Sequence, residues 1–186
     1  MKIAVLAVQG AFAEHIKMLS ELGTETIELR SKSDLSGEFD GLILPGGEST
    51  VQGKLLRELD MFEGLKERIQ NGMPVMATCA GLILLSEKLS NDNNTYFGTL
   101  PVTTRRNAYG RQLGSFYTES DFKGIGTVPM TFIRAPYIEK TQDGVKVLAE
   151  VDGKIVAVRY KNQLAMSFHP ELCADTSIHK KFLEML

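Results

Sequence analysis

An unbroken apolar run near the start of the chain places the strongest constraint on the fold. Residues 3–8, IAVLAV, contain no polar residue and are partly β-branched. A strand with one solvated face alternates polar and apolar residues, whereas a strand covered on both faces does not. The run therefore predicts a strand of a parallel sheet that has helices on both sides.

The segments that follow alternate between helical and strand patterns. Phe12, Ile16 and Leu19 repeat at helical spacing, and Gly23 is a plausible C-terminal cap for that helix. Further strands are expected at 24–29, 41–44 and 74–78, and further helices at about 50–59, from there to 70, and at 81–89. This order predicts an α/β fold, a doubly wound and mostly parallel sheet flanked by helices.

The C-terminal half is richer in strand patterns. Short β-rich pieces are expected around 100–104, 115–118 and 131–133, followed by a hairpin over 145–158 that turns at Asp152-Gly153. A last strand over 163–168 leads to a helix near 176–186. No repeat or linker interrupts the chain, so one domain over residues 1–186 is expected.

Composition excludes several classes of partner. A formal charge of -2 and a pI near 6.0 give no basic field that would attract nucleic acid or an anionic membrane. The N-terminal apolar run is too short for a signal peptide or a membrane span. Two cysteines, Cys79 and Cys173, are too few for a disulfide framework and indicate a reducing, cytoplasmic environment.

Cys79 stands between an expected strand and an expected helix, in the sequence TCAG at 78–81. A sharp turn at this point would project a nucleophile above the sheet, and small neighbours such as Ala80 and Gly81 would relieve the crowding. The start of a helix also favours a thiolate over a thiol. The alternative is that Cys79 is a small buried apolar residue, because free cysteines are often buried.

His169 and Glu171 flank a proline at the end of the last expected strand. Residues two apart in an extended chain share a face, and Pro170 restricts the backbone of His169 to extended conformations. One imidazole nitrogen could then face a nucleophile while the other donates to the carboxylate. A surface turn is the alternative. His15 and His179 lie in amphipathic helices without such a neighbour, and we interpret them as structural.

The segment GGEST at 46–50 follows another expected strand. Two glycines allow backbone amides to point into a cleft, where they could stabilise an oxyanion. Ser49 and Gln52 have the spacing of a capping box, which predicts a helix start. A plain turn or a phosphate-binding loop is the alternative, although the Walker lysine is absent and Gly10 alone follows the first strand, which argues against nucleotides.

These three segments all follow expected strands of one α/β pattern. Ligands of such sheets bind beyond the carboxyl ends of the strands. The sequence therefore predicts that Cys79, His169 and the Gly46-Gly47 turn meet at one edge of the sheet.

At these residues the sequence resembles the class I glutamine amidotransferases, in which a cysteine at an elbow acts with a distant His-Pro-Glu. More closely, it is similar to the glutaminase subunits of pyridoxal 5'-phosphate synthases. The shared motifs run nearly from end to end: VQGAFAEH (8–15), LPGGEST (44–50), TCAGLI (78–83), RNAYGRQ (106–112), SF (115–116), FIRAP (132–136) and SFHPEL (167–172).

The resemblance implies a catalytic triad with Cys79 as nucleophile, His169 as base and acid, and Glu171 as the group that orients the histidine. It implies that the amides of Gly47 and Ala80 form the oxyanion hole. The residues that would contact L-glutamine are Gly47, Glu48, Ser49, Arg106, Ile133 and Arg134. Either arginine could bind the substrate carboxylate.

The resemblance also implies a partner, the synthase (lyase) subunit, which would dock over the site and receive ammonia by a protected route. Gln9 and Gly10 would lie near that contact. The Gly46-Gly47 peptide could switch the oxyanion hole between an unformed and a formed state. No metal ion and no other cofactor is expected.

Two other functions remain open at this stage. A thiol hydrolase or peptidase on a related fold would need no partner and would accept peptides or esters. A non-catalytic binding module would have kept the fold without the chemistry, although the complete set of Cys79, His169 and Glu171 argues against it.

Overall fold

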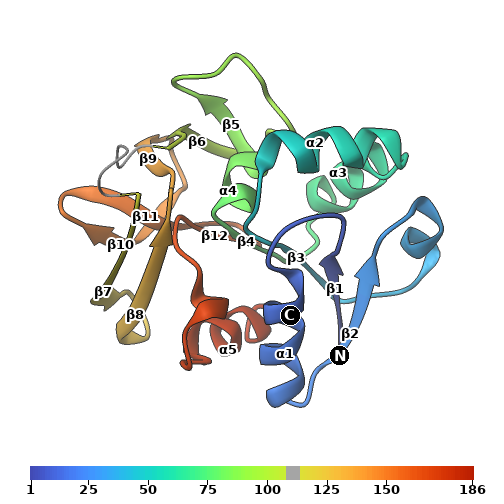
Figure 1. The fold of residues 1–186 in the computed structure, drawn as a ribbon, viewed down its shortest axis with the longest axis horizontal. Coiled ribbons are helices and arrows are strands. Elements are labelled where there is room, and N and C mark those ends of the chain that lie inside the picture. The colour runs from blue at the N-terminus through green and yellow to red at the C-terminus, as the bar shows by residue number, and fades with distance from the viewer. Residues whose placement is uncertain (108–113) are drawn as a thin grey trace.

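The computed structural model describes residues 1–107 and 114–186, and its main feature is a mixed sheet with helices on both faces (Figure 1). The parallel half has the strand order β2-β1-β3-β4-β12. Its strands are β1 (Lys2–Leu6), β2 (Glu25–Leu29), β3 (Gly41–Leu44), β4 (Val75–Thr78) and β12 (Gln163–Met166). The expectation of a doubly wound, mostly parallel sheet is confirmed for this half.

The sheet continues from β12 through the order β11-β9-β6-β5, with β10 paired to β11. These strands are β5 (Ser86–Leu89), β6 (Leu100–Arg105), β9 (Tyr137–Thr141), β10 (Lys146–Val151) and β11 (Lys154–Tyr160). The pairs are antiparallel except for β5 with β6. The hairpin β10–β11 turns at Asp152-Gly153, both with positive φ, as the sequence predicts.

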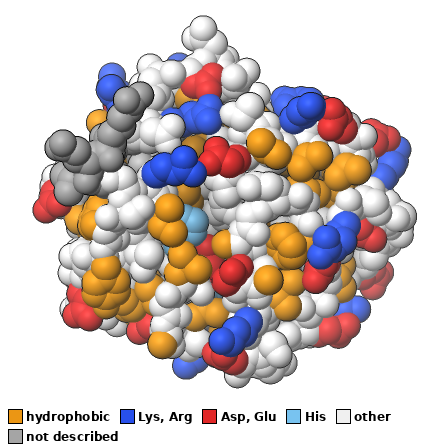
Figure 2. All heavy atoms as spheres, viewed as in Figure 1, with side chains coloured by type: hydrophobic (Ala, Val, Ile, Leu, Met, Phe, Trp, Pro, Cys, Tyr) orange, Lys and Arg blue, Asp and Glu red, His pale blue; other side chains and the backbone are white. Residues whose placement is uncertain are grey.

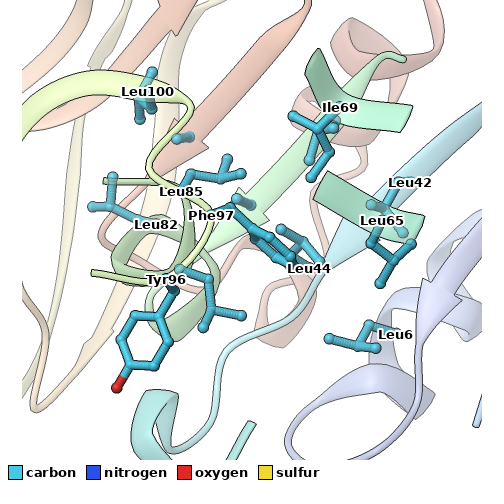
Figure 3. Close-up of a cluster of buried hydrophobic side chains, with 14 of the residues drawn as sticks. Leu6, Leu42, Leu44, Leu65, Ile69, Leu82, Leu85, Tyr96, Phe97 and Leu100 are labelled. Atoms are coloured by element: carbon cyan, nitrogen blue, oxygen red, sulfur yellow. The ribbon is translucent and has the colours of Figure 1, made fainter. Parts of the chain in front are cut away.

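Helices α2 (Ser49–Glu58), α3 (Phe62–Gln70) and α4 (Ala80–Leu85) cover one face of the sheet. Figure 3 shows the core under them, where Leu6, Leu42 and Leu44 of the sheet pack against helix side chains such as Leu65 and Leu82. The opposite face carries α1 (Phe12–Glu21), α5 (Ser177–Leu183) and a separate ribbon of β7 (Ser115–Phe122) and β8 (Gly126–Ile133). Two 3-10 turns, η1 (Lys32–Ser36) and η2 (Pro170–Leu172), complete the elements.

Strand β1 shows why its sequence does not alternate. Ala4 and Leu6 belong to the core under α2–α4, whereas Ile3 and Val5 belong to the core under α1 and α5. All four side chains are fully buried. Both faces of the strand therefore require apolar residues, and the predicted central strand is confirmed.

The helix expected over 81–89 is wrong in its second half. Helix α4 ends at Leu85, and residues 86–89 form strand β5 beside β6. The hydroxyl of Ser86 bonds to the carbonyl of Leu82 at 2.7 Å and to the hydroxyl of Thr104 at 2.8 Å. Pairing with a strand that comes later in the chain thus outweighs the local helical spacing.

Three strands of the structure are missing or shorter in the prediction from sequence. Strand β9 has one buried residue, Ile138, and so gives little of the alternation on which a prediction depends. The pieces expected at 115–118 and 131–133 are the outer ends of two eight-residue strands, β7 and β8. Among the described residues, no helix has the length and apolar character needed to cross a membrane.

Candidate active site

Three neighbouring strands, β3, β4 and β12, end at the same edge of the sheet. Leu44 pairs with Ala77, and Thr78 pairs with Met166, so the chain leaves all three strands at one level. The amide of Cys79 donates to the carbonyl of Met166 at 2.9 Å. The predicted meeting of the three segments beyond these strands is confirmed.

Cys79 occupies the predicted elbow between β4 and α4. Its φ is 47° and its ψ is -98°, a conformation that L-residues rarely adopt. A Cβ at Gly81 would lie 2.2 Å from the carbonyl oxygen of Leu44, so the helix can start this close to β3 because residue 81 is glycine. Cys79 is buried, with 6% of its surface exposed, but it lines a pocket and is therefore not enclosed in the core.

The imidazole of His169 connects the thiol to a buried carboxylate. Its Nδ1 lies 2.7 Å from Oε1 of Glu171, and the ring is within hydrogen-bonding reach of Cys79. The expectation that residues 169–171 are extended is wrong, because Pro170 begins the turn η2 and His169 has a ψ of 86°. The turn still brings both side chains together, and Glu171 lies behind His169 rather than in the pocket.

The charges of this group favour a protonated imidazole. Burial disfavours the imidazolium, but hydrogen bonds and charges from Cys79 and Glu171 outweigh burial and raise the pKa of His169 to about 10. Burial likewise opposes ionisation of Glu171, yet the neighbouring imidazoles of His15 and His169 hold the pKa of its carboxyl below the usual range. At neutral pH the site therefore holds an imidazolium between the Glu171 carboxylate and the sulfur of Cys79.

A pocket of about 220 Å³ opens above Cys79 and His169. It is smaller than the roughly 300–1,000 Å³ of pockets that hold drug-sized ligands, so its size suits an amino acid. Each of the six residues expected to contact substrate lines it, and so does Gln9. Three residues that were not predicted individually also line it, although they lie inside the motifs quoted above: Ile83, Asn107 and Pro136.

Charged side chains of both signs stand at the pocket. Nη2 of Arg134 lies 3.0 Å from Oε1 of Glu48 in a largely exposed ion pair. Arg106 is less exposed and is held by Asp92 and by the hydroxyl of Thr50 at 3.2 Å. Figure 2 shows a histidine at the bottom of a hollow with basic and acidic side chains along its rim. His169 lines the pocket, whereas His15 and His179 are fully buried.

The Gly46-Gly47 turn is fastened to the segment after β1. The carbonyl of Gly46 accepts from the amide of Ala11 at 3.0 Å, and the amide of Glu48 donates to Oε1 of Gln9 at 2.9 Å. A Cβ at Gly46 would lie 2.2 Å from the His169 ring, and one at Gly10 would lie 1.9 Å from the carbonyl oxygen of Gly46. Gly46 therefore allows the backbone to contact the imidazole, and Gly10 allows the two loops to contact each other.

The predicted capping box at residues 49–52 is wrong. Helix α2 has Glu48 at its N-cap without a side-chain cap bond, and the Ser49 hydroxyl lies inside the first turn. The side chain of Gln52 instead donates to the carbonyls of Gln9 and Pro45, at 3.0 and 3.2 Å. Gln52 thus holds the two loops together rather than capping the helix.

Some predicted residues lie outside the pocket lining, or outside the described part of the chain. Ala80 and Gly10 adjoin lining residues in sequence without lining the pocket themselves. Residues 108–112 of the RNAYGRQ motif lie outside the described residues. His15 and His179, which we interpreted as structural because no carboxylate stands beside them in the sequence as Glu171 does beside His169, are hydrogen-bonded to each other, and His15 contacts Glu171.

Comparison with solved structures defines the class of protein. The fold matches a structure described as a crystal structure of glutamine amidotransferase, with a TM-score of 0.93 and 41% sequence identity over 98% of this chain and 97% of that chain. A cysteine elbow after one central strand and a His-Glu pair after its neighbour are thus set in a glutamine amidotransferase fold.

Comparison of sequences identifies the family. The model of the SNO glutamine amidotransferase family matches residues 5–186, and the chain belongs to that family. A relative from Desulfitobacterium hafniense (strain Y51), named pyridoxal 5'-phosphate synthase subunit PdxT, is 64% identical over all of this chain and 94% of its own length. A relative of the same name from Haemophilus influenzae (strain PittEE) is 54% identical over all of this chain and 98% of its own length.

Proposed function

We propose that this chain hydrolyses L-glutamine to L-glutamate and ammonia, with Cys79 as nucleophile, His169 as acid and base, and Glu171 as the group that orients His169. The observation that carries the proposal is the 2.7 Å contact between Nδ1 of His169 and Oε1 of Glu171, beneath a pocket lined by the Cys79 thiol. Membership of a glutamine amidotransferase family supports this reaction over a peptidase or a binding module.

The first half of the reaction forms a thioester. The thiolate of Cys79 attacks the amide carbon of the glutamine side chain, and the carbonyl electrons move to oxygen. Because Nδ1 of His169 faces Glu171, Nε2 is left to serve the pocket. Nε2–H then protonates the departing nitrogen, the carbon–nitrogen bond breaks, and ammonia leaves.

The second half releases glutamate. His169 is now neutral, and its Nε2 accepts a proton from a water molecule that attacks the thioester carbonyl. The carbon–sulfur bond breaks, glutamate leaves, and the imidazolium–thiolate pair is restored. Glu171 remains ionised throughout, since its task is to hold the imidazole in position and stabilise its charge.

The developing oxyanion requires amide donors, for which we propose Gly47 and Ala80. In acyl-transfer enzymes, one such donor lowers the activation barrier by about 2.7–4 kcal/mol. The position of Gly47 depends on Gln9 and on the Gly46–Ala11 hydrogen bond, so the segment after β1 controls the donor. Movement of that segment would form or remove the hole.

Substrate recognition follows from the charges at the pocket. Free glutamine has a carboxylate and an ammonium group, and Arg134 and Glu48 offer the opposite charges 3.0 Å apart. Their exposed ion pair is weak enough to be exchanged for contacts with substrate. Arg106 is a second candidate for the carboxylate, while Ser49 and Ile133 would contact the remaining atoms from the pocket wall.

We further propose that a pyridoxal 5'-phosphate synthase subunit is the partner that receives the ammonia, because relatives at 64% and 54% identity bear the name of a subunit of that enzyme. Gln9 and Gly10 lie at the contact in this proposal. Docking at these residues would move the Gly46-Gly47 turn through the Gln9–Glu48 hydrogen bond. We place the single glutaminase domain in the cytoplasm, since Cys79 and Cys173 are both free thiols.

The test is glutamate formation from glutamine with and without the synthase subunit. We expect ammonia and glutamate in equal amounts and a higher rate in the complex, and equal rates would refute control by the partner. Cys79→Ala should fold and bind the synthase subunit but form no glutamate. Turnover by that variant, or turnover of peptides and esters in place of glutamine, would refute the proposed reaction.

A further inference from the structure

Two buried histidines lie behind the carboxylate of Glu171, and neither lines the pocket. His15 is on α1 and His179 is on α5, two helices that lie side by side on one face of the sheet (Figure 1). Their side chains have no exposed surface. The proposed chemistry at Cys79 and His169 leaves both of them without a role.

The two histidines continue the polar contacts of the triad away from the pocket. Oε1 of Glu171 faces His169, while Oε2 lies 3.4 Å from Nε2 of His15. Nδ1 of His15 lies 3.0 Å from Nε2 of His179, and Nε2 of His15 lies 3.3 Å from the Thr78 hydroxyl. Oε2 of Glu171 has no hydrogen bond from the described residues, so His15 is the group placed to compensate that buried oxygen.

The contacts favour one set of tautomers. If Nε2 of His15 bears hydrogen, it is placed to bond to the Thr78 hydroxyl and lies near Oε2 of Glu171 without a hydrogen bond to it, and Nδ1 accepts from Nε2–H of His179. Nδ1 of His179 is then a bare lone pair, which agrees with its having no partner among the described residues. The opposite tautomers would aim a lone pair of His15 at a carboxylate and leave a buried N–H of His179 unpaired.

The pair also lacks charge at neutral pH. Burial is the largest influence on both rings; it lowers the pKa of His15 and helps to lower the pKa of His179 to about 3. The ionisable groups that influence the pKa of His15 are Glu171, His169 and Glu14, and those that influence the pKa of His179 are His15 and Glu171. A neutral donor can orient the Glu171 carboxylate and still leave the negative charge of that carboxylate to stabilise the His169 imidazolium.

We propose that His15, itself oriented by His179, is a positioning residue for the hydrolysis proposed above: its Nε2 lies 3.4 Å from Oε2 of Glu171, and the attraction between the Nε2–H dipole and that oxygen keeps Oε1 directed at His169. The inference rests on the proposed glutaminase activity. It adds two side chains to the group that determines the geometry of the imidazole, and both come from helices outside the pocket.

The kinetic test compares His15→Leu, His15→Gln and the control Leu19→Ala in complex with the synthase subunit. Leu19 is buried on the same helix but has no contact with Glu171 among those described. We expect His15→Leu to lower kcat by about 10- to 100-fold with little change in KM, as when outer partners of a functional histidine are removed. The alkaline limb of its kcat–pH profile should move to lower pH, because a less well oriented Glu171 stabilises the His169 imidazolium less.

His15→Gln should recover much of kcat, since its amide nitrogen can occupy the place of Nε2. His179→Phe keeps His15 and Glu171, and it should give a smaller loss than His15→Leu. An unchanged kcat and pH profile in a folded His15→Leu would overturn the inference. Equal losses of kcat in His15→Gln and Leu19→Ala, in proportion to their losses of stability, would overturn the inference as well.

Nitrogen NMR of the wild-type protein labelled at histidine gives a readout that needs no activity. The chain has three histidines, so the spectra of His15→Gln and His179→Phe suffice to assign them. We expect neutral Nε2–H tautomers for His15 and His179 at neutral pH and a protonated His169. An Nδ1–H tautomer or a charged ring at His15 would overturn the inference even if His15→Leu did not fold.

The two proposals can fail separately. A wild-type complex that forms no glutamate refutes the proposed function and with it a positioning role in that reaction. An active wild type whose rate and pH profile are insensitive to residue 15 refutes the positioning role and leaves the glutaminase proposal intact.

Discussion

Thr78 and Met166 are register partners in the adjacent parallel strands β4 and β12. Because the two strands run in the same direction, Cys79 and Ser167 leave the sheet next to each other. His169 follows two residues later and reaches the thiol, although it is far from Cys79 in sequence. A single strand pairing thus brings Cys79 and His169, the proposed nucleophile and the proposed acid and base, together.

Glu171→Gln should make the reaction slower and narrow its pH range. The carboxylate helps to raise the pKa of His169 to about 10, so the neutral amide should lower that pKa and move the alkaline limb of kcat to lower pH. We expect kcat to fall by about 10²- to 10⁴-fold, as in other triads whose orienting acid is replaced by its amide. The pH dependence of glutamate formation in the complex is the measurement.

Glu184→Gln is the matched control for that experiment. Glu184 follows α5 and makes an exposed ion pair with Lys181, so the substitution changes charge without touching the triad. Its pH profile should equal that of the wild type. If the kcat–pH profiles of Glu171→Gln and the wild type have their alkaline limbs at the same pH, the proposed role of the carboxylate is contradicted.

Gly47→Ala should remove activity while the protein stays folded. An added Cβ at Gly47 would lie 2.4 Å from Oε1 of Gln9, so either the turn or the Gln9 side chain, which accepts from the amide of Glu48, must shift. Displacing an oxyanion donor costs about 10²- to 10³-fold in kcat. Gly153→Ala is the control, because Gly153 has a positive φ but no atom within 4 Å of an added Cβ. Equal activity of the two variants would refute an oxyanion donor at Gly47.

The parallel half of the fold could be predicted from sequence because its strands are local, continuous apolar runs. Each run ends at a chemically distinctive segment, and the rule that ligands bind beyond the strand ends was enough to bring Cys79, His169 and Gly47 together. The RNAYGRQ and FIRAP motifs also located Arg106 and Arg134 at the pocket, but through resemblance rather than through a physical pattern.

The remaining features depend on contacts between distant segments. Strand β5 has a helical spacing of apolar residues, and its conformation is decided by pairing with β6. The periodicity of α1 and α5 shows that His15 and His179 face the core, but it cannot show that the two helices meet or that η2 places Glu171 beside them. The sequence placed Gln52 in a helix cap because its spacing from Ser49 is local, whereas its actual partners, the carbonyls of Gln9 and Pro45, lie in loops that the spacing cannot show.

Arg134→Gln should raise KM for glutamine more than it lowers kcat. Arg134 lines the pocket and pairs with Glu48, so it is placed to bind the substrate carboxylate. A lost charged hydrogen bond corresponds to about 1.5–3 kcal/mol, or roughly 10- to 100-fold in KM. Arg159→Gln is the control, because Arg159 donates to the carbonyl of Lys161 and does not line the pocket. A fall in kcat at constant KM would argue for a role in the transition state instead.

The buried histidines should make the protein less stable as pH falls below neutrality. The pKa of His179 is about 3 in the folded protein and near 6.5 in the unfolded chain, so between these values the unfolded state binds the extra proton. Stability is therefore lost as pH falls, by up to about 1.4 kcal/mol per pH unit for one such group. His15, whose pKa burial also lowers, acts in the same direction.

His169 does not contribute to this slope. Its folded pKa of about 10 lies above the unfolded value, so its stabilising effect is complete below about pH 6.5 and is lost as pH rises toward 10. Carboxylates of the unfolded chain titrate mainly near pH 4. Between about pH 5 and about pH 6, where His169 is mostly protonated in both states, His15 and His179 therefore dominate the slope.

His179→Phe should show a smaller slope in that window, measured as the free energy of unfolding in urea at several pH values. Phe182→Leu serves as the control, since Phe182 is fully buried on the same helix and does not titrate. It should lower stability equally at each pH and keep the wild-type slope. If His179→Phe and the wild type lose stability in parallel as pH falls, His179 takes up its proton in the folded protein and is not held neutral by burial.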